Sequence, residues 1–261
     1  MDFYDLVSSA CAPVVISGAG MSVSCGLPTY RGEDGLWTKH PEAEARSTPP
    51  PAKLSDPAKR REWWDNVWGM WGVLRSEVDV IDPSPAHQAI AKWEARVPAL
   101  RVVTQNVDGL HQRAGSLQVH ELHGSIWRTK CSKRRCTQVP WADYTPRATA
   151  PSCPHCGRPG RPDVVLFTEP LDEMTWEQSA YACEHADLIV VVGTSGAVWP
   201  ANTLPNLGSV RGARLVRIDP GPWLGGPVSW AAEIADSADS VFGDSRFPEA
   251  LDLIGAPAQK Q

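Results

Sequence analysis

Several short apolar runs along this chain end in glycine or in small polar residues, and this pattern restricts the possible folds most strongly. A buried strand of a parallel sheet reads as a continuous apolar run, because helices cover both of its faces. Helical segments separate most of the runs, as expected when strands and helices alternate. The sequence therefore predicts an α/β fold built on a doubly wound parallel sheet. We expect its strands near residues 14, 101, 189, 216 and 241.

The segment from Thr104 to Ser125 gathers polar side chains directly after the apolar run at 100–103. Open α/β sheets bind their ligands just beyond the carboxyl ends of their strands. We therefore interpret this segment as the reaction centre. Its candidate side chains include an amide, carboxylates and several imidazoles: Asn106, Asp108, His111, His120, Glu121 and His123.

A glycine-rich turn, Gly18-Ala19-Gly20, directly follows the apolar run at 13–17. Such a turn favours a nucleotide site in which backbone N–H groups face phosphate oxygens. The fingerprint of dehydrogenases is incomplete, because Val23 stands at the third glycine position and no acidic residue ends a second strand about 20 residues on. A nucleotide site and a simple tight turn of small residues therefore both stay open.

Residues 18–48 lack helical or strand periodicity and contain Tyr30, Arg31 and Trp37. Long loops of this kind are usually functional or disordered. We expect this one to close over a ligand, with Arg31 pairing with phosphate, while a solvated position for this arginine is the alternative.

Four of the seven cysteines form two pairs with the spacing of metal ligands, Cys131–Cys136 and Cys153–Cys156. Two pairs of this type place four thiolates around one tetrahedral ion, which predicts a structural zinc site with no open position. His155 is interpreted as a bystander. The cations available to offset the charge of a four-thiolate zinc are Lys130, Lys133, Arg134, Arg135 and Arg158.

The segment 58–78 has helical spacing and carries Trp64, Trp68 and Trp71 on one face. Core packing is the simpler interpretation, and the wall of an apolar substrate channel is the alternative.

Two domains are expected from the order of these elements. Residues 1–125 and 163–261 form the main domain, with a helical insertion at about 40–80, and residues 126–162 form the small zinc-binding domain.

The bulk properties exclude several classes of protein. A net charge of -5 and a pI of about 5.8 argue against a general nucleic-acid binder. The longest apolar run, at 188–193, is too short to span a bilayer, and the first residues do not have the pattern of a signal peptide. We expect a cytoplasmic protein with no membrane or nucleic-acid partner.

These motifs together resemble the sirtuin family of NAD-dependent protein-lysine deacylases. GAGMSVSCGLPTYRG at 18–32 is similar to the family's first NAD motif, and the segments 104–115 and 121–125 are similar to its catalytic motifs. The four cysteines, RPDVVLFTE and GTSGAVWP then follow in the family's order. The resemblance covers nearly the whole chain and implies a Rossmann-like domain, NAD as co-substrate, structural zinc and an acyl-lysine protein or peptide as partner.

The resemblance also implies a role for each residue at a motif position. His123, in the family's His-Gly motif, is expected to be the general base. Gln105 and the catalytic Asn106 are expected to hold the nicotinamide ribose, and Asp108 the carboxamide. Further contacts with NAD are implied for Gly18, Ala19, Gly20, Ser22, Thr29, Tyr30, Arg31, Trp37, Gly193, Thr194, Ser195, Asp219 and Asp244. Contacts with the substrate are implied for Val164, Val165, Phe167, Trp71 and Leu74, the first two as an added strand.

The implied chemistry suits these residue types. The acyl oxygen of the modified lysine attacks the ribose carbon as nicotinamide leaves, and a dry pocket favours the loss of charge from the pyridinium. His123 then takes a proton from a ribose hydroxyl, and this hydroxyl attacks the acyl carbon. An imidazole near its free pKa suits the proton transfer at neutral pH. The products are free lysine, nicotinamide and acyl-ADP-ribose.

Departures from the family pattern bear on the acyl group. Thr29 stands where many members have Asp, which resembles the class III branch, but Trp71 and Leu74 stand at that branch's Tyr-x-x-Arg pair and Arg75 is one place out of step. An acidic acyl group would be buried unpaired, which is costly, so we predict neutral acyl groups, including larger apolar ones. Thr168 replaces the glycine expected after Phe167.

Two other functions remain as alternatives. The same NAD site serves an ADP-ribosyltransferase or an NAD glycohydrolase, which produce no acyl-ADP-ribose. A zinc-ribbon interaction module without activity is the third interpretation.

Overall fold

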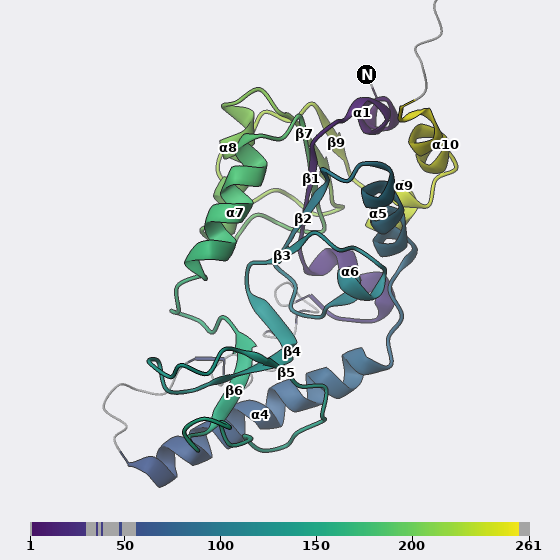
Figure 1. Cartoon of the computed structure of the whole chain (residues 1–261). Helices are drawn as coiled ribbons and strands as arrows, with labels where there is room; N and C mark the ends of the chain where they lie inside the picture. The colour runs from purple at the N-terminus through teal and green to yellow at the C-terminus, as the bar shows by residue number, and fades with distance from the viewer. Residues whose placement is uncertain (1, 30–34, 36–37, 39–46, 49–55, 256–261) are drawn as a thin grey trace, which may run out of the picture.

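The computed structural model describes residues 2–29, 35, 38, 47–48 and 56–255 of the chain. Two β-sheets lie one above the other in Figure 1, and helix α4 (Pro57–Asp79) runs beneath the lower sheet. The upper sheet has six strands and the lower sheet has three.

All strands of the upper sheet are parallel, in the order β3-β2-β1-β7-β8-β9. Every residue of its two central strands, β1 and β7, is buried. This confirms the doubly wound parallel sheet that the continuous apolar runs predict. The strands are β1 (Pro13–Ser17), β2 (Arg101–Thr104), β3 (Val119–Glu121), β7 (Leu188–Val192), β8 (Arg214–Ile218) and β9 (Ala232–Ile234).

The strand predicted near residue 241 is wrong, because Ala238–Phe242 forms the helix α9. The side chain of Ser237 caps this helix, and Val241 and Phe242 turn one helical face into the core. The last strand is β9 instead. It has three residues at the edge of the sheet, too few to show an alternating pattern.

Helices cover both faces of the upper sheet. Val15 and Val190 face one layer of helices, while Val14 and Ile189 face the other, as the alternation of side chains along a strand requires. The first layer contains α1 (Phe3–Ser9), α5 (Pro85–Arg96), α9 and α10 (Arg246–Leu253), and the second contains α7 (Glu173–Glu184) and α8 (Leu204–Ser209). Within the described ranges, no helix has the length and apolarity needed to cross a membrane.

Three neighbouring strands of the upper sheet end at the same level. Ser17 is in register with Thr104 on β2 and with Val192 on β7. The segments that follow these three strands therefore meet at one edge of the sheet. They begin with η1 (Ala19–Cys25) after β1, α6 (Leu110–Arg113) after β2 and η2 (Ala201–Thr203) after β7.

The lower sheet is antiparallel and carries the four cysteines at one side. Its order is β5-β4-β6, with β4 (Gly124–Cys131) between β5 (Trp141–Ala142) and β6 (Gly160–Val164). Gly124 has a φ of 79°, and a Cβ there would lie 2.0 Å from the Asp163 carbonyl oxygen. The two strands that connect the sheets therefore approach each other at a residue that must be glycine.

Helix α4 packs its tryptophans against the lower sheet. Trp64, Trp68 and Trp71 are all buried, and the Trp68 Nε1 donates to the Gly160 carbonyl at 2.9 Å. They belong to a second core cluster that also contains Leu27, Val107 and Ile126. The predicted single tryptophan face is confirmed, and its role is core packing.

Candidate functional site

Two loops cross in close backbone contact at the carboxyl ends of β1 and β7. The Gly20 N–H donates to the Gly193 carbonyl at 2.8 Å, and the Gly18 N–H donates to the Val192 carbonyl. A Cβ on Gly18 would lie 2.6 Å from the Thr194 Cβ, and one on Gly193 would lie 2.3 Å from the Met21 nitrogen. These glycines leave a cradle of exposed backbone, which fits the close approach of a dinucleotide phosphate.

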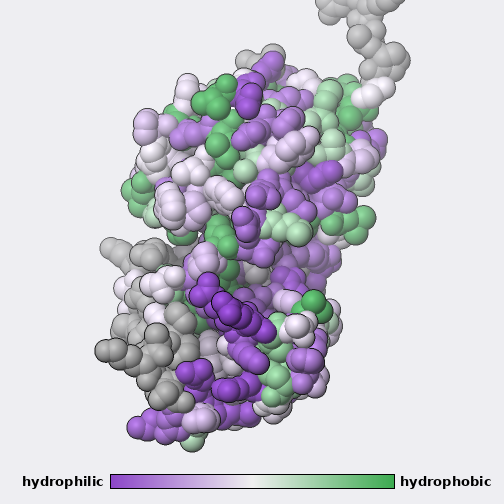
Figure 2. Space-filling model, turned by 60° about the vertical axis from the view of Figure 1, so that its left-hand side comes forward, coloured by the Kyte–Doolittle hydropathy of each residue, from purple (hydrophilic) through white to green (hydrophobic). Residues whose placement is uncertain are grey.

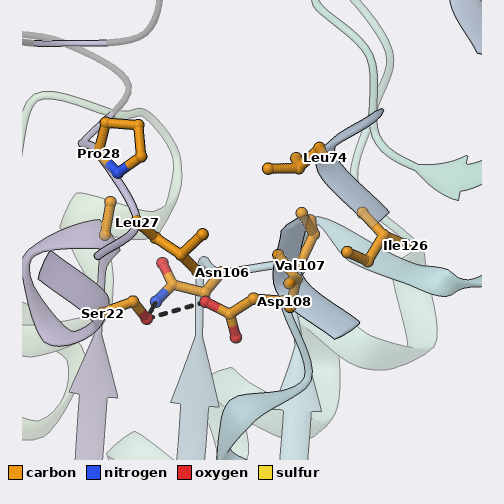
Figure 3. Close-up of a pocket in the computed structure, with 10 residues that line it drawn as sticks. Ser22, Leu27, Pro28, Leu74, Asn106, Val107, Asp108 and Ile126 are labelled. Carbon is orange, nitrogen blue, oxygen red and sulfur yellow. Dashed lines mark hydrogen bonds between the residues drawn. The ribbon is translucent and has the colours of Figure 1, made fainter. Parts of the chain in front are cut away.

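Ser22, Asn106 and Asp108 form one hydrogen-bonded cluster beside this cradle (Figure 3). The Asn106 Nδ2 donates to the Gly18 carbonyl at 3.0 Å and to the Ser22 Oγ at 3.2 Å. The Ser22 Oγ in turn donates to the Asp108 carboxylate at 2.8 Å. The side-chain oxygen of Asn106 is therefore left to face the cavity or a ligand.

The Asp108 carboxylate lies in an apolar setting at the wall of this cavity. Burial raises its pKa, although hydrogen bonds from the Leu110 N–H and from Ser22 favour the charged form. Most of the apolar wall comes from the motif segments 18–32 and 104–115 and from Leu74, while Val78 and Ile126 lie outside the motifs. The cavity is lined by Ala19, Ser22, Leu27, Pro28, Leu74, Val78, Asn106, Val107, Asp108 and Ile126.

His123 lies between β3 and β4, with its ring held by the backbone. Its Nδ1 is 2.8 Å from the Gln105 carbonyl oxygen, which accepts only, so we assign the proton to Nδ1 and leave Nε2 as a free acceptor. Burial lowers the pKa of this imidazole, and the bond to Gln105 partly opposes the shift. The ring is therefore neutral at pH 7 and can act as a base through Nε2.

Gln105 also connects the loops that follow β2 and β7. Its Nε2 donates to the Thr194 Oγ1 at 3.2 Å, and its N–H donates to the Ser17 carbonyl. The next residue, Ser195, accepts from the Leu224 N–H through its carbonyl at 2.7 Å. The structure thus brings Gln105, Thr194 and Ser195 to the same edge of the sheet as the glycine cradle.

The acidic residues predicted to contact NAD lie in two different places. Asp219 follows β8 directly, at the carboxyl edge, where its Oδ1 accepts from the Gly221 N–H at 2.7 Å. Asp244 lies between α9 and α10 and is held by Arg246, which also lies 3.7 Å from Asp2. Asp244 lies beside Tyr4 of α1, at the start of the chain before β1, so the structure does not bring Asp244 to the cluster of Asn106.

Four more of the predicted contacts lie farther along the long loop, beyond the glycine cradle and Ser22. Thr29 is half-buried, two residues beyond the cavity residue Leu27. Tyr30, Arg31 and Trp37 lie outside the described residues.

The predicted peptide-binding edge begins at the end of β6, an outer strand of the lower sheet. Val165 N–H donates to the His123 carbonyl at 2.9 Å, which ties this edge to the imidazole. The Val164 carbonyl accepts from Arg161, and the Phe167 N–H donates to the Ser47 carbonyl. Part of the outer edge is therefore already occupied by internal hydrogen bonds.

A tight turn follows this edge. The Glu169 N–H donates to the Leu166 carbonyl at 3.0 Å, and Thr168 has a φ of 71°. Residue 168 is thus the third residue of a type II turn, where glycine is preferred because φ is positive. Glu169 holds the turn by pairing with the buried Arg161.

Trp71, Leu74 and Arg75 point to different surroundings although they are neighbours on α4. Leu74 lines the cavity, and Trp71 is buried in the tryptophan core. The Arg75 side chain is 1% exposed and donates to the carbonyls of Ile126 and Thr145, both at 2.9 Å. Its guanidinium lies 3.6 Å from the Asp143 carboxylate, so its positive charge is neutralised inside the protein.

A buried polar chain behind the cavity was not anticipated from the sequence. The Ser17 Oγ donates to the Thr104 Oγ1 and lies 2.9 Å from the His111 Nε2. His111 packs edge-on against His87, with ring centroids 4.8 Å apart. Desolvation lowers the pKa of both imidazoles, to about 4 for His87. His111 is therefore a structural residue, separate from the base candidate.

His120 and Glu121 also have partners away from the cavity. The His120 Nδ1 lies 3.2 Å from the Ser179 Oγ on α7, and Glu121 accepts from Arg128 at 2.6 Å.

The four cysteine sulfurs lie within 4.8 Å of one another. The Cys131–Cys156 distance is 3.5 Å, and Cys136 lies 3.8 Å from both Cys153 and Cys156. Four sulfurs at about 2.3 Å from a tetrahedral zinc are about 3.8 Å apart. The donor set and its spacing therefore fit structural zinc, with no position left for a water ligand.

Comparison with known proteins agrees with this geometry. A model described as "Sir2 family" matches residues 18–200. The NAD-dependent protein deacylase 2 of Pyrobaculum aerophilum is 44% identical over 223 residues, which cover 85% of each protein. The NAD-dependent protein deacylase of Mycobacterium tuberculosis strain H37Rv is 39% identical over 228 residues, covering 85% of this chain and 90% of its own length.

Solved structures show the same fold. A Sir2 homologue mutant in complex with ADP-ribose has a TM-score of 0.84 and 32% identity, covering 97% of this chain and 99% of the other. A Sir2 homologue in complex with NAD has a TM-score of 0.81 and 31% identity, covering 97% and 94%.

Proposed function

Because the chain belongs to the Sir2 family, we propose that it uses NAD to remove a neutral acyl group from lysine side chains of proteins or peptides. The observation that carries the chemistry is the fixed orientation of His123, whose Nδ1 contacts the Gln105 carbonyl and whose Nε2 is free to accept a proton.

The residues around the cradle fit the parts of NAD. The backbone of Gly18, Ala19 and Gly20 would face the phosphates, with Gly193, Thr194 and Ser195 on the facing loop. Ser22, Asn106 and Asp108 would hold the nicotinamide end, and Asp219 a ribose hydroxyl. When bound, NAD would supply the ribose carbon that the acyl oxygen attacks. With one water molecule consumed, the products would be nicotinamide, free lysine and acyl-ADP-ribose.

The remaining steps depend on this chain's own side chains. Asn106 is held by the Gly18 carbonyl and by Ser22, so its amide keeps one orientation. His123 takes a proton at Nε2, and the Gln105 carbonyl stabilises the resulting imidazolium through Nδ1–H. The apolar wall of the cavity excludes water from the developing charge.

The proposed preference for a neutral acyl group follows from the contacts that Arg75 makes inside the protein. Its guanidinium is committed to two backbone carbonyls and to Asp143, so it is unable to reach a substrate carboxylate. Of the side chains that line the described cavity, Asp108 alone is ionisable. A succinyl or malonyl carboxylate would therefore enter an apolar space without a cation, which is costly.

Two further parts of the proposal concern organisation. We propose that residues 126–162 form the zinc-binding small domain and that residues 1–125 and 163–261 form the NAD-binding domain. In support, Cys131 ends β4 of the lower sheet, and the other three cysteines lie in the segments that connect its strands. None of the seven cysteines forms a disulfide and four of them form the thiolate cluster, which favours the reducing cytoplasm as the compartment.

The central experiment compares the wild type with His123→Ala and with the matched control His120→Ala. His120 is a neighbouring imidazole that contacts Ser179 on α7 instead of the cavity. With NAD and an acetyl-lysine peptide, we expect acyl-ADP-ribose in the product mixture and a loss of about 100-fold or more in kcat for His123→Ala only. Free ADP-ribose or ADP-ribosylated protein as the sole product would instead support the glycohydrolase or transferase alternative.

The acyl preference is tested on peptides that differ only in the modification. We expect acetyl-lysine and longer apolar acyl-lysines to react faster than succinyl-lysine, by about 10-fold or more because the acidic group lacks a partner. A dominant succinyl activity would contradict the assignment of Arg75.

A further inference from the structure

Positive charge is concentrated in residues 126–162, which we call the zinc-bound body, and negative charge in the rest of the chain. Residues 126–162 contain eight Lys and Arg residues and one Asp, a net charge of +7. The rest of the chain has 17 Lys and Arg against 29 Asp and Glu, a net charge of -12. Four thiolates and one Zn²⁺ carry about -2, so the zinc-bound body keeps about +5. Offsetting the thiolates therefore accounts for only part of this charge.

Half of these cations are already paired. Arg128 and Lys130 pair with Asp163, Arg147 pairs with Asp143, and Arg161 pairs with Glu169. The other four surround the cysteine cluster, are exposed, and have no carboxylate within ion-pair distance in the described part of the chain. We call them the basic face: Lys133, Arg134, Arg135 and Arg158.

A groove of about 830 Å³ connects the basic face with the predicted peptide edge. Its lining includes Lys133 and Arg134 as well as Val165 and Thr168. Figure 2 shows hydrophilic side chains gathered across the lower part of the molecule, and a hollow between its lower and upper parts. A protein held at Val165 by its acyl-lysine would therefore have a neighbouring segment within reach of these cations.

We propose that the basic face docks an acidic segment of the protein substrate, close to the acyl-lysine in space. The proposal rests on the proposed function and adds a preference among its substrates. Exposed cations on a body of opposite charge to the rest of the chain attract acidic segments and raise their local concentration. A protein segment is favoured over nucleic acid because the groove leads to the lysine-binding edge and the whole chain is acidic.

The test uses acetyl-lysine peptides with the same core. One has glutamines on both flanks, and the others carry glutamates on the amino-terminal or the carboxyl-terminal flank. At about 0.01 M salt, we expect kcat/KM to be about 3- to 10-fold higher for one acidic peptide than for the neutral one, as for a few exposed ion pairs. At about 1 M salt the difference should disappear, because screening then acts over about 3 Å.

Two variants locate the effect. Lys133→Glu combined with Arg134→Glu should reverse the preference between acidic and neutral peptides, while zinc content by metal analysis shows that the site is intact. Lys92→Glu makes the same kind of charge change at an exposed position on α5 and should leave the ratio unchanged.

The outcomes separate the two proposals. Equal rates on all peptides in the wild type, with acyl-ADP-ribose formed, would overturn the docking surface alone. No acyl-ADP-ribose from any peptide would overturn the proposed function. Tight binding of a fluorescein-labelled single-stranded oligonucleotide that the double variant loses, without a peptide preference, would assign the basic face to nucleic acid and contradict the proposal.

Discussion

Thr168→Gly should make the protein more stable, although most replacements by glycine destabilise. Thr168 is β-branched and adopts a φ of 71°, the third position of a type II turn. The left-handed region costs an L-residue about 1–2 kcal/mol, because its Cβ approaches the following carbonyl oxygen. The turn keeps this conformation because Glu169 is tied to Arg161 and to the Leu166 N–H.

The net change follows from two opposing effects. Glycine removes the strain of about 1–2 kcal/mol, and it adds about 0.4–1 kcal/mol of conformational entropy to the unfolded chain. A stabilisation of about 0.5–1 kcal/mol remains. For a protein of this size it corresponds to an increase of about 1–4 °C in Tm.

Thermal unfolding of the NAD-free, zinc-loaded protein measures this change in Tm, and two further variants serve as controls. Thr168→Ala keeps the Cβ and should recover little of the gain. Thr149→Gly changes the same residue type at an exposed position without positive φ, and should lower Tm. If Thr168→Gly lowers Tm as much as Thr149→Gly does, the strain at residue 168 is absent and the argument fails.

Three other changes test the buried site, the metal and the acyl preference. Burial lowers the pKa of His87 to about 4, while the unfolded imidazole binds a proton below about pH 6.5. The stability is therefore complete above pH 6.5 and falls by roughly 3 kcal/mol as the pH decreases to about 4, which urea unfolding measures and which His87→Gln should reduce. Cys153→Ser should lose the bound zinc in metal analysis, whereas the exposed Cys11→Ser should keep it. Leu74→Arg places a cation at the cavity wall and should shift the ratio of succinyl to acetyl activity by about 10-fold or more; an unchanged ratio would place the acyl group elsewhere.

Local sequence patterns predicted the elements whose signals are strong in a few residues. The runs at β1 and β7 are apolar throughout, and both strands are buried along their whole length. Ser84 caps α5 and Pro85 begins it, as their positions in the sequence indicate. The strand prediction for segment 239–244 was wrong because its short apolar stretch fits either a strand or a helix. The cap at Ser237 favours the helix.

Some residues of the candidate site were likewise predicted from local sequence, and others were not. Asn106, Asp108 and Ser22 belong to motifs, and they meet because the strands before them end in register. Val78 and Ile126 lie outside the motifs and carry no chemical signal, so the sequence did not predict their place in the cavity wall. The surroundings of Asp244 also depend on the tertiary structure, which pairs this residue with Arg246 away from the cluster of Asn106.

By itself, the sequence determined the parallel sheet and the group of four cysteines, because these depend on contiguous patterns and fixed spacings, and the family motif singled out His123 as the predicted base. Only the tertiary structure decided which nitrogen of His123 is free, how Arg75 is neutralised and which cations near the cysteines have no ion-pair partner among the described residues. Those properties arise from contacts between residues far apart in the chain, and hydrogen bonding and burial act on distance in space rather than on order in the sequence.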